Sequence, residues 1–302
     1  MLFAIRSALR SALGAGVVFT ILSQGQQELA AASRDCQPTP LIQGAARFLK
    51  AGPPTLTLVT LNMARERALT RIQDEITRVT PLGRAEILLL QEVETPAGND
   101  PGVVQDLASR LGFNFVYSPA NVWKSGSKEG LAILSRYPLE NPAVIRLPSF
   151  DLLFRNRCRI ALTATAVTPF GRIQLFNVHL DSRVSIEERL EQLAPIVQRV
   201  REAVGPCVVA GDFNTSGLLW LGRLLPLPAG DHEIRVRNLF TSIGFRTPFV
   251  QQKATFDFLG LTLDSIFIKG LNWTSSGIEE IKFSDHRALW ITLQFETLAK
   301  TA

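Results

Sequence analysis

The chain has 302 residues, of which 46% are hydrophobic and 20% are charged, and its formal net charge is +5. These values indicate a globular protein with a sizeable core, organised as one large domain or two small ones, and they exclude a disordered or low-complexity chain. The mild positive charge is compatible with an anionic substrate or surface, but an ordinary basic surface explains it as well, so charge identifies no partner.

The first 32 residues have the order of a secretory signal peptide. Arg6 and Arg10 give a basic start, residues 11–22 form an uncharged apolar run, and residues 29–33 read LAAAS, which suits a signal peptidase. The apolar run, about 12 residues long, is shorter than the roughly 20 that a spanning helix needs. We therefore expect cleavage after Ala32 and export to the periplasm or the medium, with a retained N-terminal membrane anchor as the alternative.

The domain organisation follows from the pattern after this segment. Residues 33–54 contain glycine, proline and glutamine with little periodicity and are interpreted as a linker, with a short helix over residues 41–49 as an option. A single domain is expected over residues 55–297, followed by a short tail over residues 298–302.

Strand-like and helical patterns alternate through the domain. The runs with strand character are 57–61, 86–90, 113–117, 131–135, 159–167, 172–178, 208–210, 262–268 and 288–295. The runs with helical periodicity are 68–79, 103–111 and 186–203. Because hairpins are mixed with the alternation, the pattern favours two packed sheets with helices outside over one parallel, doubly wound sheet.

Two further features concern single segments. Residues 217–228, GLLWLGRLLPLP, are unusually apolar; we interpret them as a buried helix, with a lip that contacts lipid as the alternative. The three cysteines, Cys36, Cys158 and Cys207, are odd in number and widely spaced, which argues against a disulfide framework and a zinc site. Cys158 and Cys207 are interpreted as small buried hydrophobes rather than as a bridge between them.

Polar residues follow the strand-like runs where a strand edge does not need them. One such residue is a cap or a turn residue in most proteins, but six positions with acids, amides and two of the three histidines indicate a shared site. Oxygen ligands suit Mg²⁺ or Mn²⁺, and the sequence holds no Cys/His cluster for zinc. These residues are Asn62, Gln91-Glu92, His179, Asp212 with Asn214, Asp264, and Asp285-His286.

Seven short motifs together resemble one family. VTLNMARE, LLLQEVE, EGLAILSRYPL, NVHLDS, GDFNT, LDSIF and SDHRAL occur in the order of the endonuclease/exonuclease/phosphatase superfamily, from about residue 56 to residue 295. That superfamily includes pancreatic-type deoxyribonucleases, abasic-site endonucleases, inositol polyphosphate phosphatases and bacterial sphingomyelinases. The resemblance implies an α/β fold: a four-layered α/β sandwich with two central, mostly antiparallel mixed sheets flanked by helices.

The resemblance also implies a metal site and a pair of residues that handle water. Glu92 is similar to the main divalent-metal ligand, with Asn62 beside it, and Asp285 binds the metal directly or through water. Asp212 and Asn214 are similar to the pair that positions water and phosphate, Asn214 as a phosphate-binding residue. Whether Asp212 serves as a base or as an orienting group is left open.

Two histidines and their carboxylate partners have counterparts in the same superfamily. His286 is similar to the histidine that faces the scissile phosphate, and Asp264 to the carboxylate that fixes its tautomer. His179 resembles the second histidine of deoxyribonuclease-like and sphingomyelinase-like members, and Glu129 the acid that orients it. We expect each carboxylate to lie within hydrogen-bond reach of its histidine.

The remaining candidates carry weaker signals. Arg159 resembles a phosphate-binding arginine, although Arg157 is an alternative for that place. His232 is interpreted as a solvated loop residue, and Tyr117 as part of the core or the cleft wall. Trp123 and the neighbouring lysines fit either a nucleic-acid groove or an ordinary surface loop.

The sequence therefore predicts a phosphodiesterase that depends on Mg²⁺ or Mn²⁺. A phosphodiester is an anion, so its hydrolysis needs charge neutralisation, an activated water and a stabilised leaving oxygen, which acids, histidines and a metal supply. The expected substrate is a nucleic acid or a phospholipid headgroup, the latter with transient contact to a membrane surface. The alternatives are a phosphomonoesterase of the same superfamily and a catalytically silent binding module with the same fold.

Overall fold

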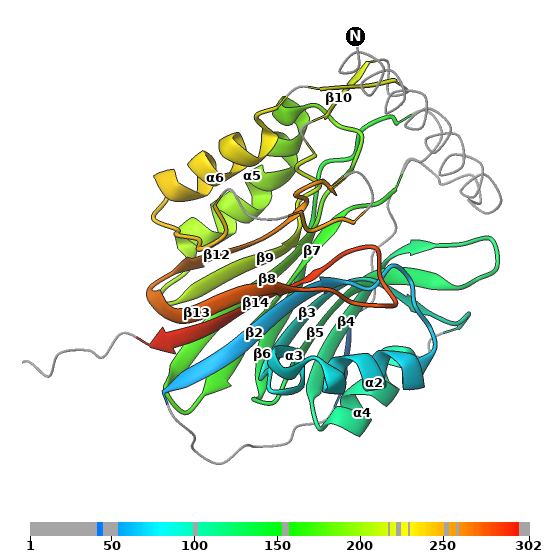
Figure 1. The fold of residues 1–302 in the computed structure, drawn as a ribbon, viewed down its shortest axis with the longest axis vertical. Coiled ribbons are helices and arrows are strands. Elements are labelled where there is room, and N and C mark those ends of the chain that lie inside the picture. Colours follow the sequence, from blue (N-terminus) through cyan, green and yellow to red (C-terminus); the bar gives the residue numbers. More distant parts are fainter. Residues whose placement is uncertain are drawn as a thin grey trace, which may run out of the picture.

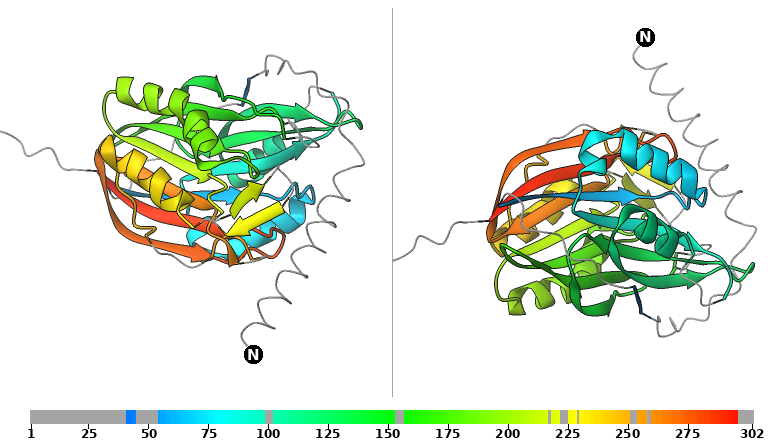
Figure 2. Two further views of the ribbon diagram at one scale, coloured as in Figure 1. Left: turned by 90° about the horizontal axis from the view of Figure 1, so that it is seen from above. Right: turned by 90° about the horizontal axis from the view of Figure 1, so that it is seen from below.

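The computed structural model describes residues 41–44, 54–98, 102–152, 157–216, 218–221, 225–228, 230–250, 254–257 and 260–295 (Figure 1). Within them, two β-sheets pack face to face and helices cover both outer faces (Figure 2). This arrangement confirms the predicted α/β sandwich. The predicted signal peptide, the C-terminal tail, Cys36 and most of the predicted linker lie outside the described residues, so the expectations for them stay predictions.

The first sheet has seven strands in the order β1-β4-β5-β3-β2-β14-β13. Its neighbours run antiparallel except for the central pair β2 and β3, which is parallel. Its strands are β1 (Ile42–Gly44), β2 (Thr55–Asn62), β3 (Ile87–Thr95), β4 (Asn114–Val122), β5 (Lys128–Ser135), β13 (Leu271–Glu279) and β14 (Ala288–Phe295).

The second sheet has five strands in the order β12-β9-β8-β7-β6. Again one pair, β8 and β9, is parallel and the other pairs are antiparallel. Its strands are β6 (Leu139–Arg146), β7 (Ile160–Thr168), β8 (Gly171–His179), β9 (Cys207–Asp212) and β12 (Asp264–Lys269). A separate hairpin joins β10 (Leu218–Leu221) and β11 (Leu225–Pro228).

The helices form the outer layers of the sandwich. The seven-stranded sheet packs against α2 (Leu69–Arg78), α3 (Thr80–Gly83) and α4 (Val103–Leu111), and the five-stranded sheet against α5 (Ile186–Glu202) and α6 (His232–Ser242) (Figure 1). Helix α5 begins with a capping box, in which the Ser185 hydroxyl accepts from the Glu188 amide and the Glu188 carboxylate accepts from the Ser185 amide.

The continuous apolar run of β3 has its cause in this layering. Ile87 and Leu89 point into the core between the two sheets, whereas Leu88 and Leu90 point into the core under the helices. Because side chains alternate along a strand, a strand buried on both faces is apolar at every position. Burial on both faces places β3 at the centre of its sheet. The residues that follow Leu90 therefore lie at the edge of the sandwich.

Several sequence predictions are wrong in this structure. The option of a helix over residues 41–49 is replaced at its start by strand β1, and residues 217–228 contain the β10–β11 hairpin instead of a helix. His232, predicted as a solvated loop residue, is buried at the start of α6. Strands β6 and β13 and helix α6 are absent from the prediction because their mixed polarity gives no clear period; β13, for example, alternates irregularly between exposed and half-buried residues.

The cysteines divide into two kinds. Cys207 is a free, buried thiol in β9, as the sequence predicts. Cys158 is disulfide-bonded, so its interpretation as a small buried hydrophobe is wrong. Separately, the described helices include none that is both long and apolar enough to cross a lipid bilayer.

Candidate active site

The structure brings most of the predicted site residues together at one end of the two sheets. Glu92 is partly buried, with 19% of its side chain exposed, and Asp285 is exposed. The others are buried: Asn62, Glu129, Arg159, His179, Asp212, Asn214, Asp264 and His286.

The two parallel strand pairs determine this gathering. Strands β2 and β3 place Asn62 opposite Gln91, and strands β8 and β9 place His179 opposite Asp212. Because the carboxyl ends of parallel strands meet at one edge of a sheet, each pair delivers its last residues to the same place. Gly211, with φ of +144°, precedes Asp212, and a Cβ at Gly211 would lie 2.0 Å from the Val178 carbonyl oxygen, so only glycine allows this pairing.

Asp212 occupies the centre of the site. Its Oδ1 accepts a hydrogen bond from the Asn214 amide at 2.9 Å, and its Oδ2 accepts one from Asn62 Nδ2 at 3.1 Å. The same Oδ2 lies 3.6 Å from His179 Nε2 and 3.8 Å from His286 Nε2. Both imidazoles therefore face one carboxylate oxygen, which places a reacting group beside Asp212 within reach of both.

His286 is held from several sides. Its Nδ1 lies 2.9 Å from Asp264 Oδ2, as the sequence analysis expects, and the ring packs edge-on against Phe256 with centroids 5.0 Å apart. The Ser284 hydroxyl accepts from the His286 amide at 3.0 Å and donates to the Asn62 carbonyl at 2.7 Å. This serine, part of the SDHRAL motif, ties the His286 loop to the end of β2.

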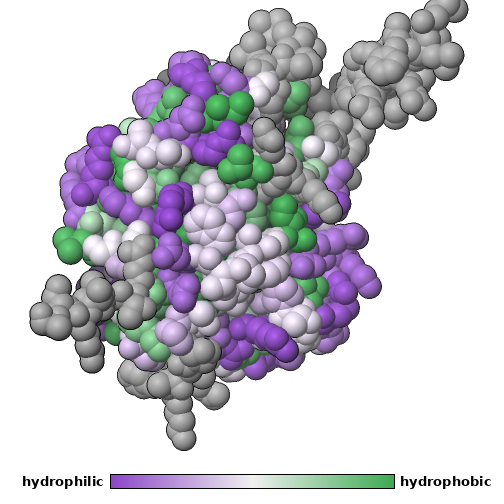
Figure 3. Space-filling view, turned by 60° about the vertical axis from the view of Figure 1, so that its left-hand side comes forward, coloured by the Kyte–Doolittle hydropathy of each residue, from purple (hydrophilic) through white to green (hydrophobic). Residues whose placement is uncertain are grey.

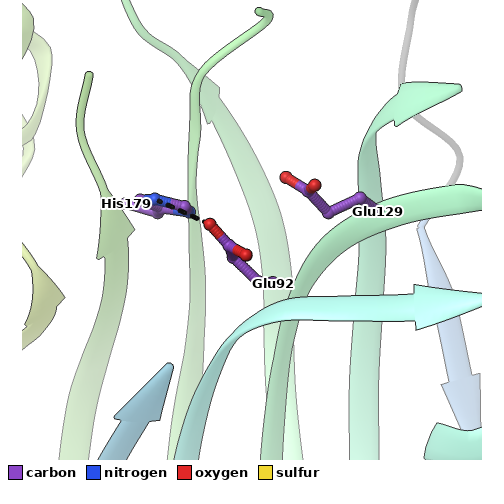
Figure 4. A group of neighbouring side chains, drawn as sticks. All are labelled: Glu92, Glu129 and His179. Carbon is purple, nitrogen blue, oxygen red and sulfur yellow. Dashed lines mark ion pairs between the residues drawn. The ribbon is translucent and has the colours of Figure 1, made fainter. Parts of the chain in front are cut away.

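Glu92 interrupts β3 with a bulge. The pairing with β5 shifts register between Leu90 and Val93, and Glu92 has a φ of +49°, a left-handed conformation that costs a non-glycine residue about 1–3 kcal/mol. This bulge turns the carboxylate toward the second sheet, where its Oε1 lies 3.9 Å from His179 Nε2 (Figure 4). Strain of this kind is typical of residues whose position serves function.

Glu129 lies beside Glu92 rather than bonding to His179. Its Oε1 is 3.5 Å from Arg157 Nη1, and its buried Oε2 has no hydrogen-bond partner among the residues that the structure describes. Among the described residues, no hydrogen bond joins Glu129 to His179, so the contact expected from the sequence is not formed in this structure. Figure 4 shows Glu129 and His179 on opposite sides of Glu92.

The donors fit a divalent cation. Glu92, Glu129 and His179 each offer a ligand atom within 4.8 Å of the others, and a second such group consists of Asp212, Asp264 and His286. A cation bound here would give the buried Glu129 Oε2 the partner that it lacks among the described residues.

The first group differs in part from the predicted metal ligands Asn62, Glu92 and Asp285. Asn62 Oδ1 already accepts from the Ala64 amide, and Asp285 is exposed and lies outside both groups. A cation held by Glu92, Glu129 and His179 would neutralise phosphate charge when bound.

The two candidate phosphate-binding arginines have different surroundings. Arg159 is buried, and its Nε lies 2.7 Å from Asp181 Oδ1, so Asp181 neutralises it. Arg157 lies closer to the carboxylates of the site, with its Nη1 4.0 Å from Glu92 Oε1 and 3.5 Å from Glu129 Oε1. Arg157, the alternative in the sequence analysis, thus faces the candidate metal group directly.

Several residues that hold this site have no role that the sequence alone indicates. Arg189 is fully buried in α5 and donates through Nη1 to the carbonyls of Asp181 and Phe213, which follow His179 and Asp212. Gln91 Nε2 donates to Asn177 Oδ1 at 2.6 Å and joins the two sheets beneath the site. The NVHLDS motif, which contains both Asn177 and Asp181, could have indicated a role for these two residues. Nothing in the amphipathic pattern of helix α5 distinguishes Arg189 from its neighbours.

The two histidines have opposite protonation at neutral pH. Burial lowers the pKa of His179 well below 6.5, and the charges of Arg159 and Arg157 lower it further. Burial also opposes the charge on His286, but the carboxylates of Asp264 and Asp212 outweigh it and raise the pKa of His286 to about 10. Burial and the charge of Asp264 raise the pKa of Asp212 to about 7.

These pKa shifts give a directional expectation for Asp264→Asn. If hydrolysis needs ionised Asp212 and protonated His286, kcat/KM rises as pH passes the pKa of Asp212 and falls as pH passes the pKa of His286. The Asp264 charge raises both pKa values. Its removal is therefore expected to move both limbs of the pH profile to lower pH. A profile of kcat/KM against pH for both proteins checks this, and unmoved limbs would contradict it.

Comparison with known proteins decides the family. The model of the endonuclease/exonuclease/phosphatase family matches residues 59–286, which include every residue of the site described above. The chain belongs to the endonuclease/exonuclease/phosphatase family.

Sequence relatives extend over less of the chain. A UPF0294 protein of Vibrio parahaemolyticus is 29% identical over 122 residues, which are 40% of this chain and 39% of that protein. A UPF0294 protein of Vibrio campbellii is 27% identical over 122 residues, which are again 40% of this chain and 39% of that protein. The chain thus spans about two fifths of the length of these curated relatives.

Solved structures of the family share the fold. A family protein from Beutenbergia cavernae has a TM-score of 0.64 at 18% identity, covering 80% of this chain and 72% of that one. The human Nocturnin catalytic domain with bound sulfate anion has a TM-score of 0.57 at 20% identity, covering 85% and 98%. D. rerio TDP2 complexed with a single-strand DNA product has a TM-score of 0.58 at 17% identity, covering 80% and 99%.

Proposed function

We propose that this protein hydrolyses phosphodiesters with the help of Mg²⁺ or Mn²⁺ bound beside Glu92. The observation that carries the proposal is the position of Asp212, whose Oδ2 lies 3.6 Å from a neutral His179 and 3.8 Å from a charged His286. A base, a cation and a neutral imidazole around one point are the groups that hydrolysis of an anionic ester needs.

Each of these residues has its own role in the proposed hydrolysis. Asp212, with a pKa of about 7, orients a water and accepts its proton near neutral pH. The imidazolium of His286 faces the phosphate and stabilises its charge, while Asp264 keeps that imidazole protonated and in one tautomer. Asn62 and Asn214 hold the Asp212 carboxylate in place. His179 remains neutral and is free to bind the cation or the phosphate.

Two substrate classes are compatible with this site, a nucleic acid and a phospholipid headgroup. Among solved structures with this fold, that of D. rerio TDP2 contains a single-strand DNA product, which supports the first class, and that of the Nocturnin catalytic domain contains a sulfate anion, which is compatible with either. On the face shown in Figure 3, hydrophobic residues are scattered among hydrophilic ones instead of forming one patch, which gives no support there to stable membrane contact. The side chains of the apolar segment 217–228 lie almost wholly outside the described residues.

A substrate panel tests the proposal. The purified protein with Mg²⁺ or Mn²⁺ is assayed on plasmid DNA, RNA, sphingomyelin, phosphatidylinositol, an aryl phosphodiester and an aryl phosphomonoester. Hydrolysis of at least one diester is expected, at a higher kcat/KM than the monoester. Preference for the monoester would identify a phosphomonoesterase instead. Binding without hydrolysis of any ester would identify a silent binding module.

We further propose that the protein is exported. The basic–apolar–LAAAS order of residues 1–33 supports this, and so does the disulfide at Cys158, because disulfides persist mainly outside the cytoplasm. N-terminal sequencing of the native protein is expected to give a start at Ser33. An intact Met1 on cytoplasmic protein would contradict export, and an intact Met1 in the membrane fraction would indicate an anchor.

A further inference from the structure

Two arginines beside Glu92 lie over the ring of one tryptophan. Trp123 lies in the turn between β4 and β5, where its amide donates to the Ser127 carbonyl at 2.8 Å, and its side chain is buried. The guanidinium carbon of Arg65 lies 5.5 Å from the centre of the Trp123 ring system, and that of Arg157 lies 5.2 Å from it. An aromatic face attracts a cation at these distances, so Trp123 fixes both guanidinium groups.

Both guanidinium groups keep unused donors beside Glu92. Arg65 Nε is 3.7 Å from Glu92 Oε2, and Arg157 Nη1 is 4.0 Å from Glu92 Oε1, which are ion-pair distances but too long for hydrogen bonds. Neither guanidinium donates a hydrogen bond to any residue that the structure describes. Each carries five N–H donors. The Arg65 side chain is 47% exposed, and the Arg157 side chain is 14% exposed with its Nη1 3.5 Å from Glu129 Oε1. An incoming anion could therefore accept from both.

The backbone turns Arg65 toward this place at a cost. Ala64 and Arg65 both have left-handed conformations, with φ of +46° and +61°. Asn62 Oδ1 accepts from the Ala64 amide at 3.0 Å and so stabilises the turn at the end of β2. Two successive non-glycine residues in this conformation are uncommon, and such strain is typical of residues that serve function.

We propose that Arg65 and Arg157, positioned by Trp123, form a subsite for a second phosphate group next to the scissile one. The proposal rests on the proposed function, because it assumes that Glu92 and Asp212 mark the scissile phosphate. Two fixed cations with free N–H donors suit the bidentate recognition of phosphate. They attract a nucleic acid strand, in which phosphates follow one another, and they repel the ammonium group of a choline headgroup. This subsite therefore favours a nucleic acid strand over a choline headgroup.

The competing explanation is that the two arginines only neutralise Glu92 and Glu129. In that case their loss changes the reaction of every phosphodiester by the same factor. A substrate pair that differs only in a second phosphate separates the two explanations. A dinucleoside monophosphate and the same compound phosphorylated at its 5′ or 3′ end share one scissile bond.

The experiment measures kcat/KM for these dinucleotides with Mg²⁺ or Mn²⁺. The wild-type protein is expected to prefer at least one phosphorylated form by about tenfold or more, the scale of charge-assisted hydrogen bonds. In Arg65→Gln that ratio is expected to fall toward one. Arg172→Gln is the matched control, because Arg172 is an exposed arginine at the opposite end of β8, and its ratio is expected to equal that of the wild type. A wild-type ratio near one, or a ratio unchanged in Arg65→Gln, would overturn the proposal.

Trp123 is tested as a positioning residue. Trp123→Leu removes the aromatic face and is expected to lose the preference mainly through KM, whereas Trp123→Phe keeps a face and is expected to retain part of it. If both variants lose the preference for the phosphorylated dinucleotide equally, and kcat falls by the same factor by which KM rises, Trp123 has a merely structural role. Thermal unfolding of each variant confirms that it is folded.

Binding measured in chelator separates this proposal from the proposed function. Calorimetry with the same dinucleotides needs no hydrolysis, and the phosphorylated form is expected to bind about tenfold more tightly to the wild type than to Arg65→Gln. If no diester is hydrolysed but this difference is found, the proposed function fails and the subsite stands. If diesters are hydrolysed but binding is the same in both proteins, the subsite fails and the function stands.

Discussion

His286→Ala is expected to lower kcat by at least about a hundredfold while the protein stays folded, since removing one group that stabilises the charge developing in the transition state typically costs about 10²–10³ in rate. The imidazolium lies 3.8 Å from Asp212 Oδ2 and 2.9 Å from Asp264 Oδ2. His179→Ala is expected to lose as much, because its Nε2 lies between Glu92 and Asp212. Asp264→Asn and Glu129→Gln are expected to fall less steeply.

His232→Ala is the matched control for both histidine variants. His232 is buried at the start of α6 and is not part of the site, so its loss is expected to lower stability by about 0.5–3 kcal/mol and to leave kcat unchanged. Single-turnover rates and thermal unfolding of the three variants compare the two kinds of effect. A His286→Ala protein that keeps kcat within a few-fold of the wild type would contradict its catalytic role, and the same result for His179→Ala would leave a one-histidine site.

Glu92→Gln is the second change with a large expected effect. Glutamine keeps the shape of the side chain but removes the charge that would bind a cation, so both the rate and the affinity for the metal should fall. We expect kcat to drop by about a hundredfold or more and the metal concentration for half-maximal activity to rise, because a bound cation contributes several kcal/mol of charge stabilisation in the transition state.

Metal titrations of the wild type and of two variants measure this effect. Glu140→Gln is the control, since Glu140 is an exposed acid paired with Arg172 far from the site, and it removes the same charge. Glu140→Gln is expected to keep the wild-type metal dependence. A Glu92→Gln protein with normal metal dependence would show that the cation, if required, is held elsewhere, and Glu129→Gln would then be titrated next.

The sequence predicted the centre of the site because its residues follow buried strands. Leu88 and Leu90 on one face of β3 and Ile87 and Leu89 on the other make a continuous apolar run, and Gln91 and Glu92 follow it. The same reasoning found His179 and Asp212 at the ends of β8 and β9. Their closeness in space then follows from the parallel pairing of these strands.

The contacts that surround this centre could not be predicted in the same way. Trp123, Arg65 and Arg157 come from three separate loops, and only the folded chain brings the guanidinium groups onto the ring. Arg159 and Arg157 are two residues apart, and sequence alone cannot say that Asp181 binds the first while the second faces Glu92. The sequence predicts a contact between Glu129 and His179. Glu129 lies beside Arg157 instead, because the bulge at Glu92 places the Glu92 carboxylate between Glu129 and His179.

The measurement that tests the account most directly is hydrolysis of a simple aryl phosphodiester before and after chelation. The account predicts that an excess of chelator abolishes hydrolysis and that added Mg²⁺ or Mn²⁺ restores it, because Glu92, Glu129 and His179 offer ligand atoms within 4.8 Å of one another. Full activity in excess chelator would contradict the central claim that this protein is a metal-dependent phosphodiesterase.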